Sequence, residues 1–479
     1  MRAGYDAART TDENTRHWAN ADAMSADAAA SPSVRRTIRN RARYEVANSS
    51  LARGIVLTLA NDVVGAGPRL QMLTNSAELN RAVEAAFSAW QRAAGLAAKL
   101  RTMRMARASD GEAFALLVTN PALPGAVKLD LSLIEADQVA TPDLFISKPG
   151  AVDGIRLDPL GNPVAYTVLR DHPGSGSVLA PTLAYDAIAA EFILHWFRAD
   201  RPGQHRGLPD IMPALNLFAV LRRYVAATVL AAELVADQSL VFKTGSPPNG
   251  QAATVGDGES LPVMEIERGV GMFCPEGWEP FQIKAEQPVL TFVEFRKAII
   301  NEIARCLNMP LNVAACDSSD YNYASGRMDH QTYFKSIRVD QIDLEEHILD
   351  RVLSAWLTEA IAAGAMAELA NQAAEEISFK HCWFWDGREH VDPAKEANAQ
   401  AQRLTSNTTT LAAEFARAGK DWETELRQRA AELNLCRELG IPTAADPSGS
   451  AAADNADDDA DERPARRSGR QGGRRGEEQ

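Results

Sequence analysis

Three acidic side chains near the middle of the chain are the residues most able to act together in chemistry: Asp317, Asp320 and Asp329. Carboxylates at this spacing can gather Mg²⁺, and bound Mg²⁺ supports hydrolysis of nucleic acid. Acidic side chains in a polar loop are, however, usually solvated and hold no ion. A metal-dependent nucleic-acid-processing enzyme, with its carboxylates near residues 317–329, is therefore one hypothesis.

Other chemistry-bearing patterns in the sequence are absent or incomplete. Cys316 with His330, and His381 beside Cys382, are the neighbouring Cys/His pairs, and neither has the paired spacing of a tetrahedral metal site. No GxxxxGK[ST] phosphate loop, GxSxG nucleophile elbow or HExxH zinc motif occurs. We therefore predict no catalytic residue, no metal site, no cofactor and no enzyme activity.

Two short motifs have an ordinary structural interpretation. Gly65-Ala66-Gly67 is followed by Pro68, where a dinucleotide-binding fingerprint would continue into a helix, so we expect the C-terminal turn of a helix. The aromatic run Trp383–Trp385 can anchor packing or stack on bases, and the sequence leaves both open.

The charge balance limits the kinds of partner that the chain can hold. Lys and Arg number 50 and Asp and Glu number 64, which gives a net charge of −14. A wide surface that grips a phosphate backbone needs clustered cations, so this chain is suited at most to touching DNA without holding it.

Length and apolar content indicate a soluble protein of several domains. Its 479 residues exceed one ordinary domain, and 46% apolar residues can bury a core. The five cysteines form no CxxC pair, which favours a reducing compartment. Residues 215–234 are the most apolar stretch, but Arg222 and Arg223 lie within it, so we expect no membrane contact.

The N-terminal half reads as mixed helix and strand. A helix begins at Pro32 after Ser31 and should run toward Asp62, and Ser76 caps another. Strand patterns and a hairpin follow, at residues 113–118, 127–134, 155–170 and 192–197. The first helix carries an arginine cluster that is either a solvated face or a contact with nucleic acid or a partner: Arg35, Arg36, Arg39, Arg41 and Arg43.

Long helices dominate the second half. Their periodic apolar residues cover 209–237, 289–308 and a helix that begins after Gly326 and may extend to Ala363. Such lengths suggest an elongated subunit packed beside copies of itself, with Leu344 and Ile348 in the seam. Residues beyond about 446 are Ala, Asp, Gly and Arg, so we expect them to be disordered.

Several of these blocks together resemble the lambda-like portal proteins of tailed bacteriophages. In order they are a long helix ending in VGxG (residues 39–70), Asp110-Gly111-Glu112 before a strand, HWFRADRPGQHRGLPDIMPALN leading into the long helix (from His195), NEIARCLNMPLNVAACDSSDYNYASGR (301–327) and WDGREHVDPAKE (385–396). The set runs in order along most of the chain.

The resemblance implies a non-enzymatic ring, usually dodecameric, at one vertex of the capsid. Such a ring passes double-stranded DNA during packaging and ejection. It docks the terminase large subunit, sits in the shell of major capsid protein and later receives head-tail joining proteins. The implied location is the virion, with assembly in the host cytoplasm.

The resemblance also implies an α+β, predominantly helical fold divided into wing, stem, clip and crown. Mapped by order, the parts are a flexible N-terminal arm (1–30), the wing (31–208), the first stem helix (209–237), the clip (238–288), the second stem helix (289–310), the tunnel loop (311–326), the long wing helix with a return strand (327–389), the crown (390–445) and a disordered charged tail (446–479).

The tunnel loop supplies the candidate site. By the resemblance its channel-lining, DNA-facing residues are Asp317, Ser318, Ser319, Asp320, Asn322 and Arg327. The loop is acidic where a DNA-gripping loop would be basic, and Arg327 is the cation expected nearest to the DNA.

Overall fold

The computed structural model divides the chain into two compact units, Met1–Trp385 and Asp386–Gln479, which are described separately. The residues described are 11–12, 15–142, 150–175, 184–237, 241–244, 278–281, 291–319, 321–366, 380–387 and 393–441. Asp320, most of the expected clip and the tail beyond 441 lie outside them.

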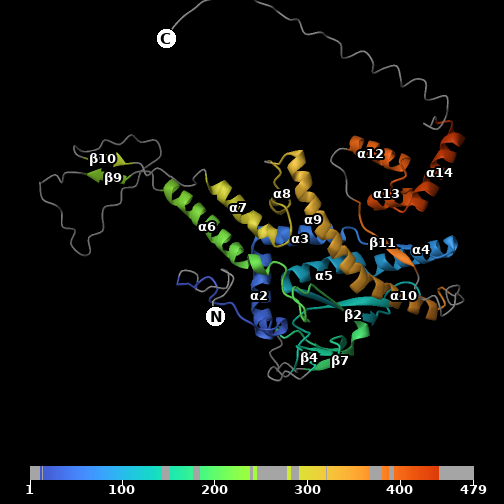
Figure 1. The fold of residues 1–479 in the computed structure, drawn as a ribbon, viewed down its shortest axis with the longest axis horizontal. Helices are drawn as coiled ribbons and strands as arrows, with labels where there is room; N and C mark the ends of the chain where they lie inside the picture. The colour runs from blue at the N-terminus through green and yellow to red at the C-terminus, as the bar shows by residue number, and fades with distance from the viewer. Residues whose placement is uncertain are drawn as a thin grey trace, which may run out of the picture. The chain divides into compact units, whose positions relative to one another are not determined.

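Helices predominate in the first unit (Figure 1), as the sequence predicts. They are α1 (Ala26–Ala29), α2 (Pro32–Asn48), α3 (Ser50–Val64), α4 (Ala77–Ala93), α5 (Leu96–Asp110), the 3₁₀ turns η2 (Ala190–Phe192) and η3 (Met212–Ala214), α6 (Leu215–Asp237), α7 (Thr291–Arg305), α8 (Leu311–Ala315), α9 (Tyr323–Leu344), the π-helical turn η4 (Glu345–Leu349) and α10 (Asp350–Ala362).

The described strands pair in antiparallel sheets. They are β1 (Arg69–Met72), β2 (Glu112–Thr119), β3 (Leu129–Ile134), β4 (Ala151–Val152), β5 (Ile155–Leu157), β6 (Pro163–Leu169), β7 (Tyr185–Ala189), β8 (Ile193–Phe197), β9 (Val241–Thr244), β10 (Trp278–Phe281) and β11 (His381–Phe384). Their orders are β3-β2-β8, β4-β5-β6-β7, β1-β11 and β9-β10. The expected hairpin is β5–β6, whose turn is closed by Asp158 accepting the Asn162 N–H at 2.8 Å.

The prediction of a single helix from Pro32 to Asp62 is wrong, because the helix is interrupted at Ser49 and continues as α3. This residue is extended (φ −113°, ψ 117°), and its side chain accepts from the Ala52 N–H at 3.3 Å to begin α3. A serine that bonds to a nearby backbone N–H competes with the helix and favours a cap. At the far end, Gly65 terminates α3 with φ 54°, so the glycine motif is the helix C-terminal turn that we predicted.

Three of the five α2 arginines, Arg35, Arg39 and Arg43, are engaged within the fold, whereas Arg36 and Arg41 are exposed. Arg35 and Arg39 are buried, and Arg35 pairs with Asp153 while Arg39 Nη1 lies 2.8 Å from Asp137 Oδ1. Arg43 forms two 2.8 Å hydrogen bonds to the carboxylate of Asp110. Buried guanidinium groups require such partners, so the cluster ties α2 to the sheets.

Two segments singled out in the sequence pass closely over each other shortly before α6 begins. The Asp110-Gly111-Glu112 turn meets Arg206-Gly207, and a Cβ on Gly207 would lie 2.0 Å from the Gly111 carbonyl oxygen. The crossing brings the buried Glu112 carboxylate onto Arg206, with Nη2 to Oε1 at 2.6 Å. Close backbone approach of this kind requires glycine.

Another buried ion-pair group holds the same region to α9. Arg104 of α5 donates to Asp210 Oδ2 at 2.9 Å and to Asp340 Oδ2 at 2.8 Å, and Arg107 donates to Asp340 Oδ1 at 3.0 Å. Asp210 lies just before α6 and Asp340 lies on α9. The approach to the first long helix and the helix that follows the candidate loop are therefore fixed to one point on α5.

The long helical run from Tyr323 to Ala362 is packed by one face. Tyr333 and Leu344 are buried, and Tyr333 Oη donates to Asp62 Oδ2 of α3 at 2.6 Å. The aromatic run at the end of β11 is anchored to these helices, because Trp383 Nε1 donates to Asp350 Oδ1 at 2.8 Å and Trp385 Nε1 to Glu345 Oε1 at 2.6 Å. Of the two interpretations, packing anchor is the one that the structure supports.

Helices α6 and α7 lie side by side (Figure 1), with the Tyr224 ring stacked 5.4 Å from Phe292. Residues Met212–Glu233 are long and apolar enough to cross a membrane by length and composition, and 17% of their most apolar window is buried. Arg222, in the middle of that stretch, pairs with Glu45 Oε2 of α2 at 2.6 Å.

The expected loose arm is tied down at its end. Asp27 of α1 accepts from the His205 backbone N–H at 3.0 Å, and Arg201 donates to the Met24 carbonyl at 3.0 Å. In the second unit the described helices are α12 (Pro393–Thr405), α13 (Leu411–Arg417) and α14 (Trp422–Leu439).

Candidate functional site

The candidate loop lies between α8 and α9, and a turn that contains Pro310 separates α8 from the preceding helix α7. After α7 the chain turns at Asn308, which has φ 52°, and Pro310 then begins α8. Cys316, also at φ 52°, ends α8, and α9 begins at Tyr323. The expected loop 311–326 is therefore helical at both ends, and its irregular part is the stretch 316–322.

Asp317 organises the first half of this stretch. Its Oδ1 accepts from the Ser319 backbone N–H at 3.0 Å and from Ser319 Oγ at 2.6 Å. The exposed Ser318 lies between them, and its carbonyl accepts from the Tyr321 N–H at 3.2 Å. Asp317, Ser318 and Ser319 are thus brought together in one exposed turn, as expected of a loop that presents polar groups to solvent.

The second half of the stretch is a helix cap. Asn322 Oδ1 accepts from the Ser325 N–H at 2.9 Å and so caps α9. Arg327 is exposed and follows one turn later on the same helix, not on the loop. Asp320 lies outside the described residues.

Cations from α7 also act on the loop, which sequence reasoning missed. The pKa of Asp317 is lowered, first by its hydrogen bonds from Ser319 and then by the positive charges of Lys297 and Arg296. Both residues belong to α7, which precedes the loop. The sequence shows only that Arg296 and Lys297 are adjacent in the helix before the loop. It does not show how far they lie from Asp317.

Asn312 holds both ends of the stretch. Its backbone carbonyl accepts from the Asp317 N–H at 3.1 Å, and its side-chain amide lies 2.9 Å from His330 Nε2 on α9. His330 is therefore engaged by Asn312. Contacts of Asn312 therefore hold the two ends of this stretch close together.

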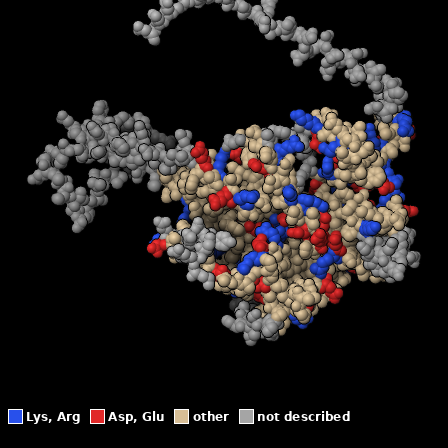
Figure 2. Space-filling model, viewed as in Figure 1, with Lys and Arg blue, Asp and Glu red and all other residues tan. Residues whose placement is uncertain are grey.

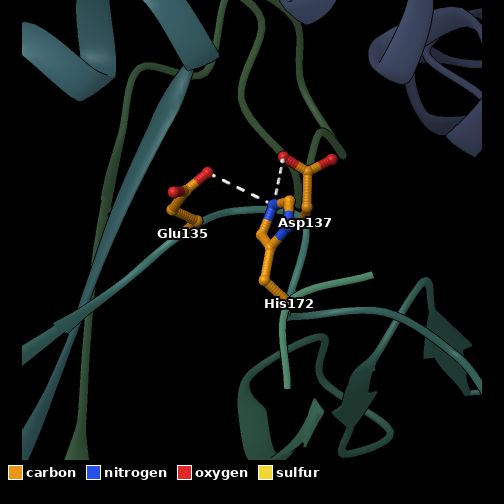
Figure 3. Close-up of side chains that lie close together, drawn as sticks. All are labelled: Glu135, Asp137 and His172. Atoms are coloured by element: carbon orange, nitrogen blue, oxygen red, sulfur yellow. Dashed lines mark ion pairs between the residues drawn. The ribbon is translucent and has the colours of Figure 1, made fainter. Parts of the chain in front are cut away.

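Glu135, Asp137 and His172 are the group of three metal-type side chains that the described part of the chain brings together (Figure 3). His172 Nε2 lies 3.3 Å from Glu135 Oε2 and 3.7 Å from Asp137 Oδ2. Arg43 also reaches both carboxylates, with Nη1 2.8 Å from Asp137 Oδ2 and Nη2 3.1 Å from Glu135 Oε2.

The guanidinium groups decide what this group can do. Arg39 and Arg43 occupy the Asp137 carboxylate, and although burial alone would raise the pKa of Asp137, these two charges lower it. A divalent cation would have to displace a guanidinium and approach two positive charges. We interpret the three residues as part of an ion-pair network between the sheets and α2.

A comparison with protein families decides the assignment. The family model described as phage portal protein, lambda family, matches residues 11–341. The chain belongs to the lambda family of phage portal proteins. The matched region contains the β3-β2-β8 and β4-β5-β6-β7 sheets, helices α6 and α7 and the whole candidate loop, so the portal resemblance drawn from the motifs is confirmed.

Individual proteins are also similar to this chain. The probable portal protein of Halomonas phage phiHAP-1 is 24% identical over 445 residues, covering 88% of this chain and 83% of that protein. Among solved structures, a chain from the neck of a native gene transfer agent particle covers 81% of this chain and 94% of its own length, with 14% identity and a TM-score of 0.45. An HK97-family portal protein from Corynebacterium diphtheriae covers 62% and 85%, with 15% identity and a TM-score of 0.28.

As a member of the portal family, the chain is a structural component of a phage and not an enzyme. The metal-dependent enzyme hypothesis is not favoured. Among the described residues, Asp317 and Asp329 join no group of three possible metal ligands, and Asp317 is already bonded to Ser319.

Proposed function

We propose that this portal protein assembles into a ring, usually of twelve copies in its family, that forms the DNA channel at one vertex of the capsid. The observation that carries the proposal is the family match over residues 11–341. The ring would pass double-stranded DNA inward during packaging and outward during ejection. It would be built in the host cytoplasm and remain in the virion.

Each part of the subunit has a role in this proposal. The assigned parts are the wing (31–208), the stem helices (209–237 and 289–310), the clip (238–288), the channel loop (311–326), the long wing helix with β11 (327–389) and the crown (390–445). The narrower stretch 316–322 is the part that we expect to face DNA, with Asp317, Ser318, Ser319, Asp320 and Asn322 near the duplex and Arg327 behind them.

Charge supports a channel that lets DNA slide. The visible face of the molecule carries acidic and basic side chains interspersed, with no wide basic surface (Figure 2). Each subunit adds −14 to the ring, and the loop turn is built on Asp317. Cations that bind phosphates release counterions and hold DNA firmly, so few accessible cations favour passage.

Uncovered apolar side chains on the two stem helices support packing against neighbouring copies. Val229 and Leu230 of α6 are 51% and 55% exposed, and Val293 and Phe295 of α7 are 56% and 49% exposed. Large exposed apolar surfaces of soluble proteins usually mark interfaces. This assignment accounts for the membrane-like composition of α6 without a membrane.

Three further partners follow from the family role. We expect the ring to dock the terminase large subunit during packaging, to sit in the shell of major capsid protein and to receive head-tail joining proteins afterwards. Because the chain holds no nucleotide-binding motif, the energy for packaging has to come from the docked motor.

The native thiol of Cys316 gives a direct test. Cys316 is exposed and immediately precedes Asp317, whereas Cys306, Cys382 and Cys436 are half-buried. We expect negative-stain images to show rings with a hole of duplex width. Treating these rings with a bulky maleimide should reduce the length of DNA packaged in an assembly extract, because the adduct projects into the DNA path.

The matched control is the Cys316→Ser ring treated in the same way, which retains every other thiol. It should package a full length of DNA after treatment. If maleimide-treated wild-type and C316S rings package the same length of DNA, the loop does not line the channel. A chain that forms no ring would refute the portal assembly itself.

A further inference from the structure

The C-terminal helices lack a hydrophobic core of their own. Among the described residues 394–441, the one buried side chain is that of Glu414, which is 4% exposed and accepts from Arg403 at 2.9 and 3.0 Å. Within residues 394–441 no apolar side chain is buried. Helices of this length are marginal in water unless an apolar face is packed.

Large apolar side chains are instead exposed on this unit. They are Leu411 (44%), Trp422 (37%), Leu426 (40%), Leu435 (53%), Leu439 (62%) and Ile441 (51%). Exposed groups of this size and number mark a surface that another chain or segment covers.

The tail that follows cannot cover this surface. Residues 442–479 contain no Val, Ile, Leu, Met, Phe, Tyr or Trp. A segment without large apolar side chains has nothing with which to fill a hydrophobic face. The covering surface must therefore come from elsewhere.

The charge of the unit suits identical copies. Residues 393–441 hold seven acidic and seven basic side chains, so this segment is neutral within a chain of net charge −14. Several of the charges pair along α14 itself, as Arg427 does with Glu423 at 2.5 Å and Arg429 with Glu432 at 3.3 Å. Neutral copies can lie side by side without the mutual repulsion that the rest of the chain would impose.

The placement of the apolar residues suits a ring. With 3.6 residues per turn, Trp422, Leu426 and Leu433 fall on one side of α14, and Leu435 and Leu439 fall roughly 140° away. A head-to-tail ring gives each subunit two different neighbours and so needs two different contact surfaces.

We propose that residues 393–441 build their hydrophobic core between chains, by packing against the same residues of the two neighbouring copies. The inference rests on the ring of the proposed function and names the partner of its C-terminal unit. It follows that α14 is stable in the ring and frays in the unassembled chain.

Hydrogen exchange on the full-length protein tests the proposal. Rings and unassembled chain are separated by size exclusion, and amide exchange is followed by mass spectrometry. We expect α14 amides to exchange at least about tenfold more slowly in rings than in unassembled chain, with α3 and α5 protected in both. Equal protection of α14 in both fractions, or its absence from rings, would overturn the proposal.

Substitutions identify the surface. The double variant Leu435→Asp/Leu439→Asp should lose the ring-specific protection of α14, whereas Leu160→Asp, the same change at an 89% exposed residue of the β5–β6 turn, should keep it. Wild-type protection in rings of the double variant would exclude this interface. Failure of the wild-type chain to form any ring would count against the portal assembly and is visible in the first size-exclusion step.

Discussion

At the scale of single residues, Glu112 is a buried carboxylate on which several hydrogen-bond donors converge. Its side chain is fully buried and accepts from Arg206 Nε at 2.8 Å, Arg39 Nη2 at 3.1 Å and His195 Nε2 at 3.2 Å. Burial alone would raise the pKa of Glu112, but the charge of Arg206 and the hydrogen bonds hold it well below its ordinary value of 4.5. The carboxylate therefore remains ionised and balances buried cations.

Glu112→Gln should destabilise the unassembled chain by about 3–5 kcal/mol, because it leaves buried guanidinium groups without their counter-charge. Denaturant unfolding measures the loss. Since the folded pKa is depressed, the stabilisation is present above pH 4.5 and is lost as pH falls through the folded value, so the gap between variant and wild type should narrow below pH 4.5.

Glu135→Gln is the control for this substitution, because that side chain is 57% exposed and pairs at the surface. Its effect should stay within about 1 kcal/mol. Equal losses in the two variants would mean that Glu112 is not the centre of the network.

At the scale of elements, the approach to the first long helix depends on two glycines. Gly111 has φ 93°, and a Cβ there would lie 2.5 Å from the Leu208 backbone. Gly207 faces the Gly111 carbonyl even more closely. Asp210, which follows this crossing, accepts from Arg104 of α5, so the crossing sets how the chain approaches α6.

Gly207→Ala should therefore destabilise the subunit by about 1–3 kcal/mol, because the added methyl group would meet the Gly111 backbone and the Cβ of Phe197, neither of which is the far end of a flexible side chain. Gly54→Ala on α3 is the matched control. Nothing lies within 4 Å of its added methyl group, and it should stabilise the chain by about 0.5–1 kcal/mol through helix propensity. Thermal unfolding of both variants decides, and an unchanged melting temperature for G207A would mean that the crossing is loose.

At the scale of the whole molecule, the faces of the continuous helical run of α9 and η4 separate subunit folding from ring assembly. Leu344 and Ile348 are 0% exposed within their own chain, so the expectation that they lie in a seam between copies is wrong. Val339 and Ile342, on the opposite face, are 54% and 37% exposed. A charged substitution at the buried pair is expected to unfold the subunit. A charged substitution at the exposed pair is expected to disturb only contacts with a neighbouring copy.

Val339→Asp/Ile342→Asp should leave the melting temperature of the unassembled chain unchanged and abolish the large oligomer. Size exclusion with light scattering measures the second effect. Leu344→Asp should lose the folded subunit itself, because a charge is buried without a partner. A full-size ring in the V339D/I342D variant would show that this face of α9 meets no neighbouring copy.

Local patterns allowed much of the fold to be predicted from the sequence, including a polar irregular stretch ahead of α9. Ser76 caps α4, Asp158 closes the β5–β6 turn, and the α6 helix ends at Asp237 as expected. These features depend on residues within a few positions of one another, where propensity and capping act directly. The ordered motifs were also enough to indicate the portal family.

Only the tertiary structure decided how distant charges and faces are used. The sequence alone leaves Arg35, Arg39 and Arg43 of α2 open to interpretation as a solvated face, and only the fold pairs them with Asp153, Asp137 and Asp110. Likewise, the periodicity of α9 marks its apolar residues but cannot say which of them contact the same chain. These outcomes depend on side chains many residues apart coming together, and burial then makes each charge require a partner, which no local pattern encodes.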